Sequence, residues 1–396
     1  MPTVEPMWEA ILRATSGKPY TFVVMPFGSR FDTFTVVERA VERAVGLSCI
    51  RADDIKAAGY DLLGKVQLAI GRAELVIVDI SEPSQNVFYE LGYAAGIRKP
   101  ILLIAEKGVL VPTNLKGLLL IEYEPPRDRT KAETFSNNLQ AELQSRVNTQ
   151  VALLKDMLLG ESPLPAYICA HPKHPSSNAR IRRQVYDRRT FGDNLGILGL
   201  LSAFGAIFGE TTNVDLVSAQ YHAPDLLDRD VNLYLIGSSK VNPATPTMLR
   251  RLVRDREPKW EFVPASGKGD YTVSLYRTER GATNEVTGKI GPSPLVEGSR
   301  VHTEDCGIVV RGPHPDHPNR LVLVMAGAHS IGSGAACLTA TKSFLIQQIK
   351  QKLPEGVLAD KQRTFWALVR GKMNDKDGML DVEGVKVEEA GVYSET

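Results

Sequence analysis

The 396-residue sequence contains few cysteines, no marked excess of either charge and no apolar run long enough to cross a membrane. Four cysteines lie far apart in the chain without a Cys-x-x-Cys motif: Cys49, Cys169, Cys306 and Cys337. This usage excludes a dense disulfide framework and indicates reduced, buried thiols in a cytoplasmic protein. The formal net charge is +1, so composition provides no overall electrostatic argument for a nucleic-acid or membrane-surface partner.

Two targeting features are also absent from the sequence. Residues 1–17 lack the basic start and the apolar centre of a signal peptide. The apolar run Leu195–Phe208 is shorter than the ~20 residues that span a bilayer, and it contains Gly199 and Gly205. We therefore expect a buried helix at this run and no membrane partner.

Several chemical signatures are missing as well. The sequence has no Gly-x-Ser-x-Gly elbow for a serine nucleophile. His314 and His317 are three residues apart, but the prolines around them favour an extended loop between strands, so we expect neither a metal site nor a cofactor. Trp8, Trp260 and Trp366 are too dispersed to form a base-stacking platform and are interpreted as core residues.

The stretch 74–97 organises the first half of the chain. Its apolar run predicts a strand that ends on Asp79, and Asn86 is suited to cap the following helix, which carries Glu90. Because α/β sheets bind ligands at the carboxyl ends of strands, Asp79 and Glu90 are expected at one rim. A helix N-terminus favours the ionised form, so Glu90 is expected to remain a carboxylate near neutral pH. The alternative of equal weight is that Asp79 caps a turn and Glu90 is a solvated helix residue.

The first predicted strand, Tyr20–Met25, leads into a tight loop. The loop consists of Pro26, Phe27, Gly28, Ser29 and Arg30. Gly28 permits close backbone approach and Arg30 supplies a cation, so a phosphate is expected here. A plain turn explains the same residues equally well.

Two carboxylates, Asp53 and Asp54, follow the second predicted strand, Leu47–Arg51. Such a pair would hold ribose hydroxyls or share a proton with a leaving base. Both would equally serve to cap the next turn, an interpretation that we favour slightly more for Asp53. Ser81, in the turn after the central strand, and Asn86 are further candidate contacts with substrate.

Five predicted parallel strands alternating with helices indicate a flavodoxin-like α/β domain over residues 1–128. A helical pattern at 129–160 follows, about 45 Å long at 1.5 Å per residue. Its apolar stripe suits a dimer interface of a homo-oligomer or a rigid connection, and packing across the first domain explains it equally well. Residues 161–190, with four prolines and a basic segment, predict a linker.

Residues 191–396 predict a second, Rossmann-like α/β domain. Two of its apolar strands deliver a Gly/Ser loop to a helix, which is the usual cradle for an anion such as a nucleotide phosphate. The candidate ligand contacts are Gly237, Ser238, Asn242, His329, Ser330, Gly332 and Ser333. Neither loop is a Walker A motif, and the favoured interpretation is that small residues allow tight strand-to-helix turns.

The segment Asn86–Ala94, NVFYELGYA, between an Asp-ending strand and the apolar strand at 99–104, resembles the nucleoside 2-deoxyribosyltransferase family. It is also similar to the related 2′-deoxynucleoside 5′-phosphate N-hydrolases and to bacterial TIR-like domains, over Tyr20–Tyr123. The resemblance implies that Glu90 is the nucleophile that attacks C1′ of the sugar. The transferases have an aspartate six residues earlier, where this chain has Ser84, as the hydrolases do. Hydrolysis is therefore better supported than transfer.

The resemblance implies an N-glycosidase that cleaves NAD or a (deoxy)nucleotide. In this interpretation Glu90 attacks C1′, Asp79 and Asp54 assist, and the second domain senses a nucleotide signal. By analogy with similar pairings, the chain would be an antiphage defence effector. The alternative hypothesis, from a different functional class, is a non-catalytic nucleotide-binding or scaffold protein.

Overall fold

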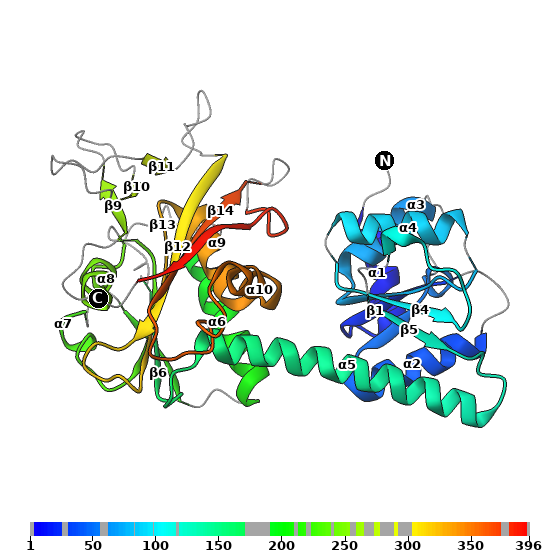
Figure 1. Ribbon diagram of the computed structural model, residues 1–396. Coiled ribbons are helices and arrows are strands. Elements are labelled where there is room, and N and C mark those ends of the chain that lie inside the picture. The colour runs from blue at the N-terminus through cyan, green and yellow to red at the C-terminus, as the bar shows by residue number, and fades with distance from the viewer. Residues whose placement is uncertain are drawn as a thin grey trace. The chain divides into compact units, whose positions relative to one another are not determined.

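The structure, a computed structural model, divides into two compact units, Met1–Thr149 and Gln150–Thr396 (Figure 1). It describes residues 4–25, 31–55, 62–82, 84–97, 99–115, 119–170, 191–209, 213–218, 223–238, 241–253, 259–264, 273–277, 289–291, 303–373 and 380–393. Both units combine helices with a sheet, which confirms the predicted α/β class and the presence of two α/β domains.

The first unit is built on a five-stranded parallel sheet with the order β2-β1-β3-β4-β5. The strands are β1 Tyr20–Val24, β2 Ser48–Ile50, β3 Leu75–Asp79, β4 Ile101–Glu106 and β5 Leu120–Tyr123. This is the flavodoxin-like order, in which the direction of winding reverses between β1 and β3. The predicted parallel sheet is therefore confirmed.

Helices cover both faces of this sheet. They are α1 Val4–Thr15, α2 Phe31–Val45, α3 Leu62–Arg72 and α4 Gln85–Gly96. Figure 1 shows α3 and α4 on one face and α2 with the long helix α5 on the other. Side chains of β3 alternate between the faces: Val76 and Val78 pack in the core under α3 and α4, and Leu75 and Ile77 pack in the core under α2 and α5.

Helix α5, Arg129–Leu158, confirms the predicted long helix and contributes to both units. Phe135, Leu139 and Leu143 are buried in the core of the first unit. Met157 and Leu158, near the other end, are buried in the core of the second. The buried part of the apolar stripe is therefore used within the units.

The second unit contains a seven-stranded mixed sheet with the order β15-β14-β12-β13-β8-β6-β7. Its strands are β6 Ala166–Ala170, β7 Val214–Ser218, β8 Asn232–Ile236, β12 Glu304–Pro313, β13 Leu321–Gly327, β14 Phe365–Lys372 and β15 Lys386–Val392. The neighbours β7, β6, β8 and β13 are parallel, whereas β12 and β15 are antiparallel to their partners. The sheet is thus only partly Rossmann-like. Strand β6 lies inside the stretch predicted as a linker, so that prediction was wrong for these residues. The strand was missed because its five residues are too few to show a clear pattern between prolines.

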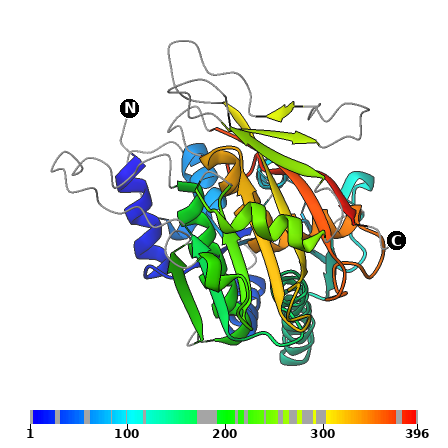
Figure 2. The same cartoon turned by 90° about the vertical axis from the view of Figure 1, so that its left-hand side faces the viewer.

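Helices again cover the two faces of this sheet. They are α6 Phe191–Phe208, α7 Ala223–Leu226, α8 Ala244–Leu252, α9 Ser330–Thr341 and α10 Ser343–Lys352. Figure 1 shows α8 on one face and α6, α9 and α10 on the other, and Figure 2 shows α8 on the near face. The apolar run predicted as a buried helix forms α6, with Leu200 and Phe204 in the core. In the described ranges no helix has the length and apolarity needed to cross a membrane.

A small antiparallel sheet completes the second unit. It has the order β11-β10-β9, from β9 Trp260–Pro264, β10 Val273–Arg277 and β11 Lys289–Gly291. Trp260 is buried and packs edge-on against Trp366 of β14, with ring centres 5.3 Å apart. Both tryptophans are core residues, as the sequence predicted.

Candidate functional site

A small hollow of about 140 Å³ lies at the carboxyl end of β1 in the first unit. Among the described residues, it is lined by Phe22, Val23, Met25, Arg51, Ala52, Asp53, Ser84, Asn86, Val87 and Glu90. These residues come from β1, from the turn after β2 and from the start of α4, which follows β3. The hollow therefore lies where the winding of the sheet reverses, the usual ligand position in this fold. It is smaller than the roughly 300 Å³ of a complete small-molecule site.

Glu90 lines this hollow from helix α4 and is half-buried. The helix begins two residues earlier than Asn86 would place it, because Ser84 is the N-cap and its Oγ accepts a hydrogen bond from the backbone N–H of Val87 at 3.2 Å. Glu90 thus lies beyond the first turn, where the helix dipole has little effect. Desolvation raises the pKa of Glu90 to about 7. With this pKa the carboxyl is only partly ionised near neutral pH, which differs from the expectation that Glu90 remains a carboxylate there.

Asp79 does not line the hollow with Glu90. It follows Ile77 on the face of the sheet covered by α2 and α5, because side chains alternate along a strand. Its buried carboxylate accepts hydrogen bonds from the backbone N–H and Oγ of Ser81, at 2.9 and 2.5 Å, and from the hydroxyl of Tyr123 at 2.8 Å. The expected shared hollow of Asp79 and Glu90 is therefore not formed.

Ser81 belongs to the same buried network as Asp79. Its Oγ also accepts a hydrogen bond from the backbone N–H of Glu106 at 2.8 Å, so the side chain joins the ends of β3 and β4. The geometry gives Ser81 a structural role at this position and not the expected contact with substrate.

The two carboxylates after β2, Asp53 and Asp54, have different contacts. Residues Ala52–Asp54 form a short 3-10 turn, and Asp54 accepts a hydrogen bond from the backbone N–H of Arg51 at 2.7 Å. Asp53 instead lines the hollow, as Asn86 does. Capping, which the sequence favoured slightly for Asp53, is therefore performed by Asp54. The predicted phosphate loop, Pro26–Arg30, lies outside the described residues.

Arg51 is a residue of the hollow that the sequence analysis did not single out. Its guanidinium carbon lies 4.3 Å from the centre of the Phe34 ring. The residues are 17 positions apart, on different elements, so no local pattern identifies the contact. The available signal was an arginine directly after β2, with only Ala52 between it and the paired carboxylates.

In the second unit, Asn242 of the loop after β8 uses its side-chain amide for hydrogen bonds within the protein. The side-chain amide of buried Asn242 donates hydrogen bonds to the carbonyls of Cys169 at 3.1 Å and Ile236 at 3.0 Å. Its Oδ1 accepts one from the backbone N–H of Ala244 at 3.0 Å, at the start of α8. Asn242 therefore ties two strand ends to a helix, and Ser238, also expected at a ligand, is buried beside it.

The loop between β13 and α9 binds a carboxylate of the protein through its backbone N–H groups, at the position where an external anion was expected. The buried carboxylate of Asp305 accepts hydrogen bonds from the backbone N–H groups of His329 and Gly332, at 2.8 and 2.7 Å. It also accepts one from the N–H of Cys306 at 2.8 Å. Burial nevertheless raises the pKa of Asp305 to about 6. The helix N-terminus expected to bind a phosphate is thus capped by a carboxylate from β12.

The small residues of this loop serve close packing. A Cβ added to Gly332 would lie 2.2 Å from the carbonyl oxygen of Cys306. Ser330 and Ser333 accept hydrogen bonds from the backbone N–H groups of Gly192 and Gly327, at 3.0 and 3.2 Å. The interpretation as tight strand-to-helix turns is supported, and the ligand contacts proposed for this loop are not.

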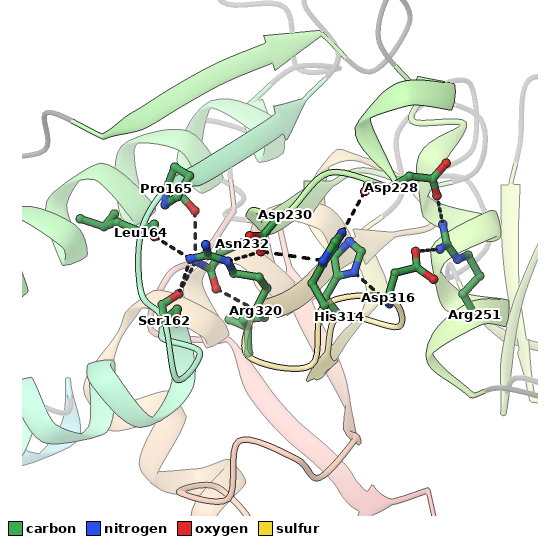
Figure 3. A network of polar contacts seen from close by, with 12 residues as sticks. Ser162, Leu164, Pro165, Asp228, Asp230, Asn232, Arg251, His314, Asp316 and Arg320 are labelled. Carbon is green, nitrogen blue, oxygen red and sulfur yellow. Dashed lines mark hydrogen bonds and ion pairs between the residues drawn. The ribbon is translucent and has the colours of Figure 1, made fainter.

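The two histidines at 314 and 317 lie in the hairpin between β12 and β13, within a polar network (Figure 3). Arg320 donates hydrogen bonds to Asp230 at 2.7 Å and to the carbonyl of Leu164 at 2.6 Å. The network thereby ties the hairpin to the segment before β6. No group of three or more metal-binding side chains occurs in the part of the chain that the structure describes.

Comparison with known proteins adds no assignment. Neither a protein-family model nor a curated protein matches the chain. A solved structure of a protein described as sugar binding, from Salmonella typhimurium LT2, is 10% identical with a TM-score of 0.22, over 59% of this chain and 74% of that one. The lysine decarboxylase LdcF of Francisella novicida is 11% identical with a TM-score of 0.25, over 60% of this chain and 32% of that one. At these TM-scores, neither structure carries an argument about the ligand or the fold.

Proposed function

We propose that the chain is an N-glycosidase that hydrolyses the N-glycosidic bond of NAD or of a (deoxy)nucleotide in the hollow of the first unit. The observation that carries the proposal is the position of Glu90, a desolvated carboxyl group at the reversal point of the sheet. Perturbed carboxyl groups in such hollows are typical of catalytic sites. The resemblance of the segment around Glu90 to the nucleoside 2-deoxyribosyltransferase family favours chemistry at C1′.

The proposed reaction has two steps. The ionised carboxylate of Glu90 attacks C1′ and forms an ester bond, and the C1′–N bond breaks with its electron pair leaving on the base. The base of a nucleotide leaves as an anion and takes a proton from water, whereas the nicotinamide of NAD leaves as a neutral molecule and takes no proton. Water then attacks C1′ and loses a proton, either to the hydroxide left by the first step or, with NAD, to solvent. The ester bond to Glu90 breaks, and the carboxylate is regenerated with retained configuration at the sugar. Asp53 and Asn86, which line the same hollow, would accept and donate hydrogen bonds to sugar hydroxyls.

Some of the initial expectations have no support in this geometry. Asp79 and Asp54 are engaged with the protein itself, so we assign neither to the reaction. The two candidate loops of the second unit are also committed to internal hydrogen bonds, and we propose no nucleotide sensor there. A role in antiphage defence stays an analogy.

The second candidate is a nucleotide-binding protein without turnover. The hydrogen bonds of Asp79 within the protein favour this candidate. The sequence predicted Asp79 beside Glu90, but Asp79 does not line the hollow. Binding and catalysis are distinguished by whether free base appears.

The test is incubation of the purified full-length protein with NAD and with each deoxynucleotide, followed by chromatography for free base. The Glu90→Gln variant should lose release by at least about 100-fold, since a neutral amide cannot form the ester. Glu42→Gln, at an exposed position of α2, is the matched control and should behave as wild type. Equal release by wild type and Glu90→Gln would remove Glu90 as the catalyst, and no release from any substrate would favour the binding protein.

A further inference from the structure

Arg51 is held in place at the wall of the hollow before any ligand is bound. Its guanidinium carbon lies 4.3 Å from the centre of the ring of Phe34, which is itself 7% exposed. Stacking of a guanidinium on an aromatic ring restricts a long, otherwise mobile side chain. Less conformational entropy is then lost when the guanidinium binds a ligand.

Among the residues that the structure describes, no acid pairs with the side chain of Arg51. Within the described ranges, the guanidinium has no hydrogen bond and no ion pair, and its Nε is buried without a partner. Asp54 bonds to the backbone N–H of Arg51 and not to its side chain. A cation that is partly desolvated and uncompensated favours an anionic neighbour.

Glu90 does not compensate Arg51 either. A guanidinium close to Glu90 would lower the pKa of that carboxyl, whereas desolvation raises it to about 7. Arg51 and Glu90 therefore line one hollow at separate positions, one cationic and one carrying a carboxyl group of variable charge. A ligand that contacts both would present an anionic group to Arg51 and its sugar to Glu90.

We propose that Arg51 is the specificity-determining residue of the hollow, and that its terminal nitrogens hold a phosphate group of the substrate. This inference rests on the proposed function and adds the residue by which the hollow would distinguish phosphorylated substrates from nucleosides. The fork of guanidinium donors matches two phosphate oxygens at once, so the contact gives orientation as well as charge. The phosphate belongs either to a nucleoside 5′-monophosphate or to the pyrophosphate of NAD.

Binding is measured first, without turnover, by calorimetry with ribose 5-phosphate and with ribose. Ribose 5-phosphate should bind the wild-type full-length protein and bind Arg51→Gln on the order of 10- to 100-fold more weakly, the range expected for hydrogen bonds to a charged group. Arg51→Lys should recover part of the loss. Arg43→Gln, at an exposed position near the end of α2, should bind as wild type.

Turnover of a deoxynucleoside, its 5′-monophosphate and NAD then gives the KM ratios within each variant. A folding defect lowers the apparent kcat for all substrates alike, and a general distortion of the hollow changes KM for all of them. Loss of a phosphate contact should instead bring the nucleoside and nucleotide KM values together in Arg51→Gln. The better wild-type substrate identifies the source of the phosphate.

The two proposals fail in different ways. Arg51-dependent binding of ribose 5-phosphate without any base release would discard the N-glycosidase and retain the phosphate contact. Glu90-dependent base release with the same nucleotide preference in wild type and Arg51→Gln would discard the role of Arg51 and retain the enzyme.

Discussion

Replacement of Asp305 by alanine should destabilise the second unit, and by more at pH 5 than at pH 7. The carboxylate accepts three backbone hydrogen bonds, two of them from the start of α9. Each buried N–H left without a partner costs about 2 kcal/mol, so the three together amount to about 6 kcal/mol. The substitution leaves Cys306, His329 and Gly332 without this acceptor.

The ionisation of Asp305 opposes part of this loss. Its pKa is 3.8 when unperturbed and about 6 in the fold, a difference of about 2, which corresponds to about 3 kcal/mol of instability at pH 7. Alanine removes that cost, which leaves a net loss of about 3 kcal/mol at pH 7. Because the pKa of Asp305 is raised in the fold, protonated Asp305 stabilises the wild-type protein at low pH. This stabilisation is lost as the pH rises through 6. The deficit of the variant should therefore be about 1 kcal/mol larger at pH 5 than at pH 7.

The assay is urea unfolding of the full-length protein, followed by the fluorescence of the buried Trp260–Trp366 pair. Glu304→Ala is the matched control, because the adjacent Glu304 is partly exposed, pairs with Lys372 at 2.8 Å and should cost less than about 1 kcal/mol. A larger deficit at pH 7 than at pH 5 would show that the helix end stabilises the ionised carboxylate. A deficit no greater than that of the control would refute the capping role.

Three further predictions concern ionisable groups in both units. If Glu90 acts as the ionised nucleophile, its pKa of about 7 makes kcat at pH 6 about tenfold lower than the plateau of kcat above pH 8. A kcat that falls as the pH rises would instead make Glu90 a proton donor. Burial lowers the pKa of His314 to about 4, so stability should be lost as pH falls from 6.5 to 4. In urea unfolding this loss should be smaller for His314→Asn, and equal losses would contradict it. Lys361 donates to the carbonyls of the last turn of α5, at 3.0 and 3.1 Å, so Lys361→Met should lower the free energy of unfolding by about 1–2 kcal/mol, with exposed Lys350→Met near zero.

The parallel sheet of the first unit was predictable from the sequence because its signals are local. The apolar run before Asp79 and the stripe of α5 each fill a window of consecutive residues. The start of α4 was less certain, since Ser84 and Asn86 are both good N-caps and only the backbone shows which one is used.

The parts of the site that the sequence did not reveal depend on contacts between distant residues. Asp305 caps a helix that begins 25 residues later, and Arg51 stacks on a ring 17 residues earlier. The pKa of Glu90 depends on how much water reaches it, which is a property of packing and not of neighbours in the chain. The side of the sheet on which Asp79 lies follows from strand alternation, once the helix over each face is known.

The course of α5 determines where the polypeptide can be divided for expression. A fragment that stopped at residue 128, the predicted domain boundary, would lack Phe135, Leu139 and Leu143, which cover one side of the first sheet. Such a fragment would leave Tyr123 and its apolar neighbours open to water and prone to aggregate. A fragment designed to contain the first unit should therefore retain this helix at least through Leu143.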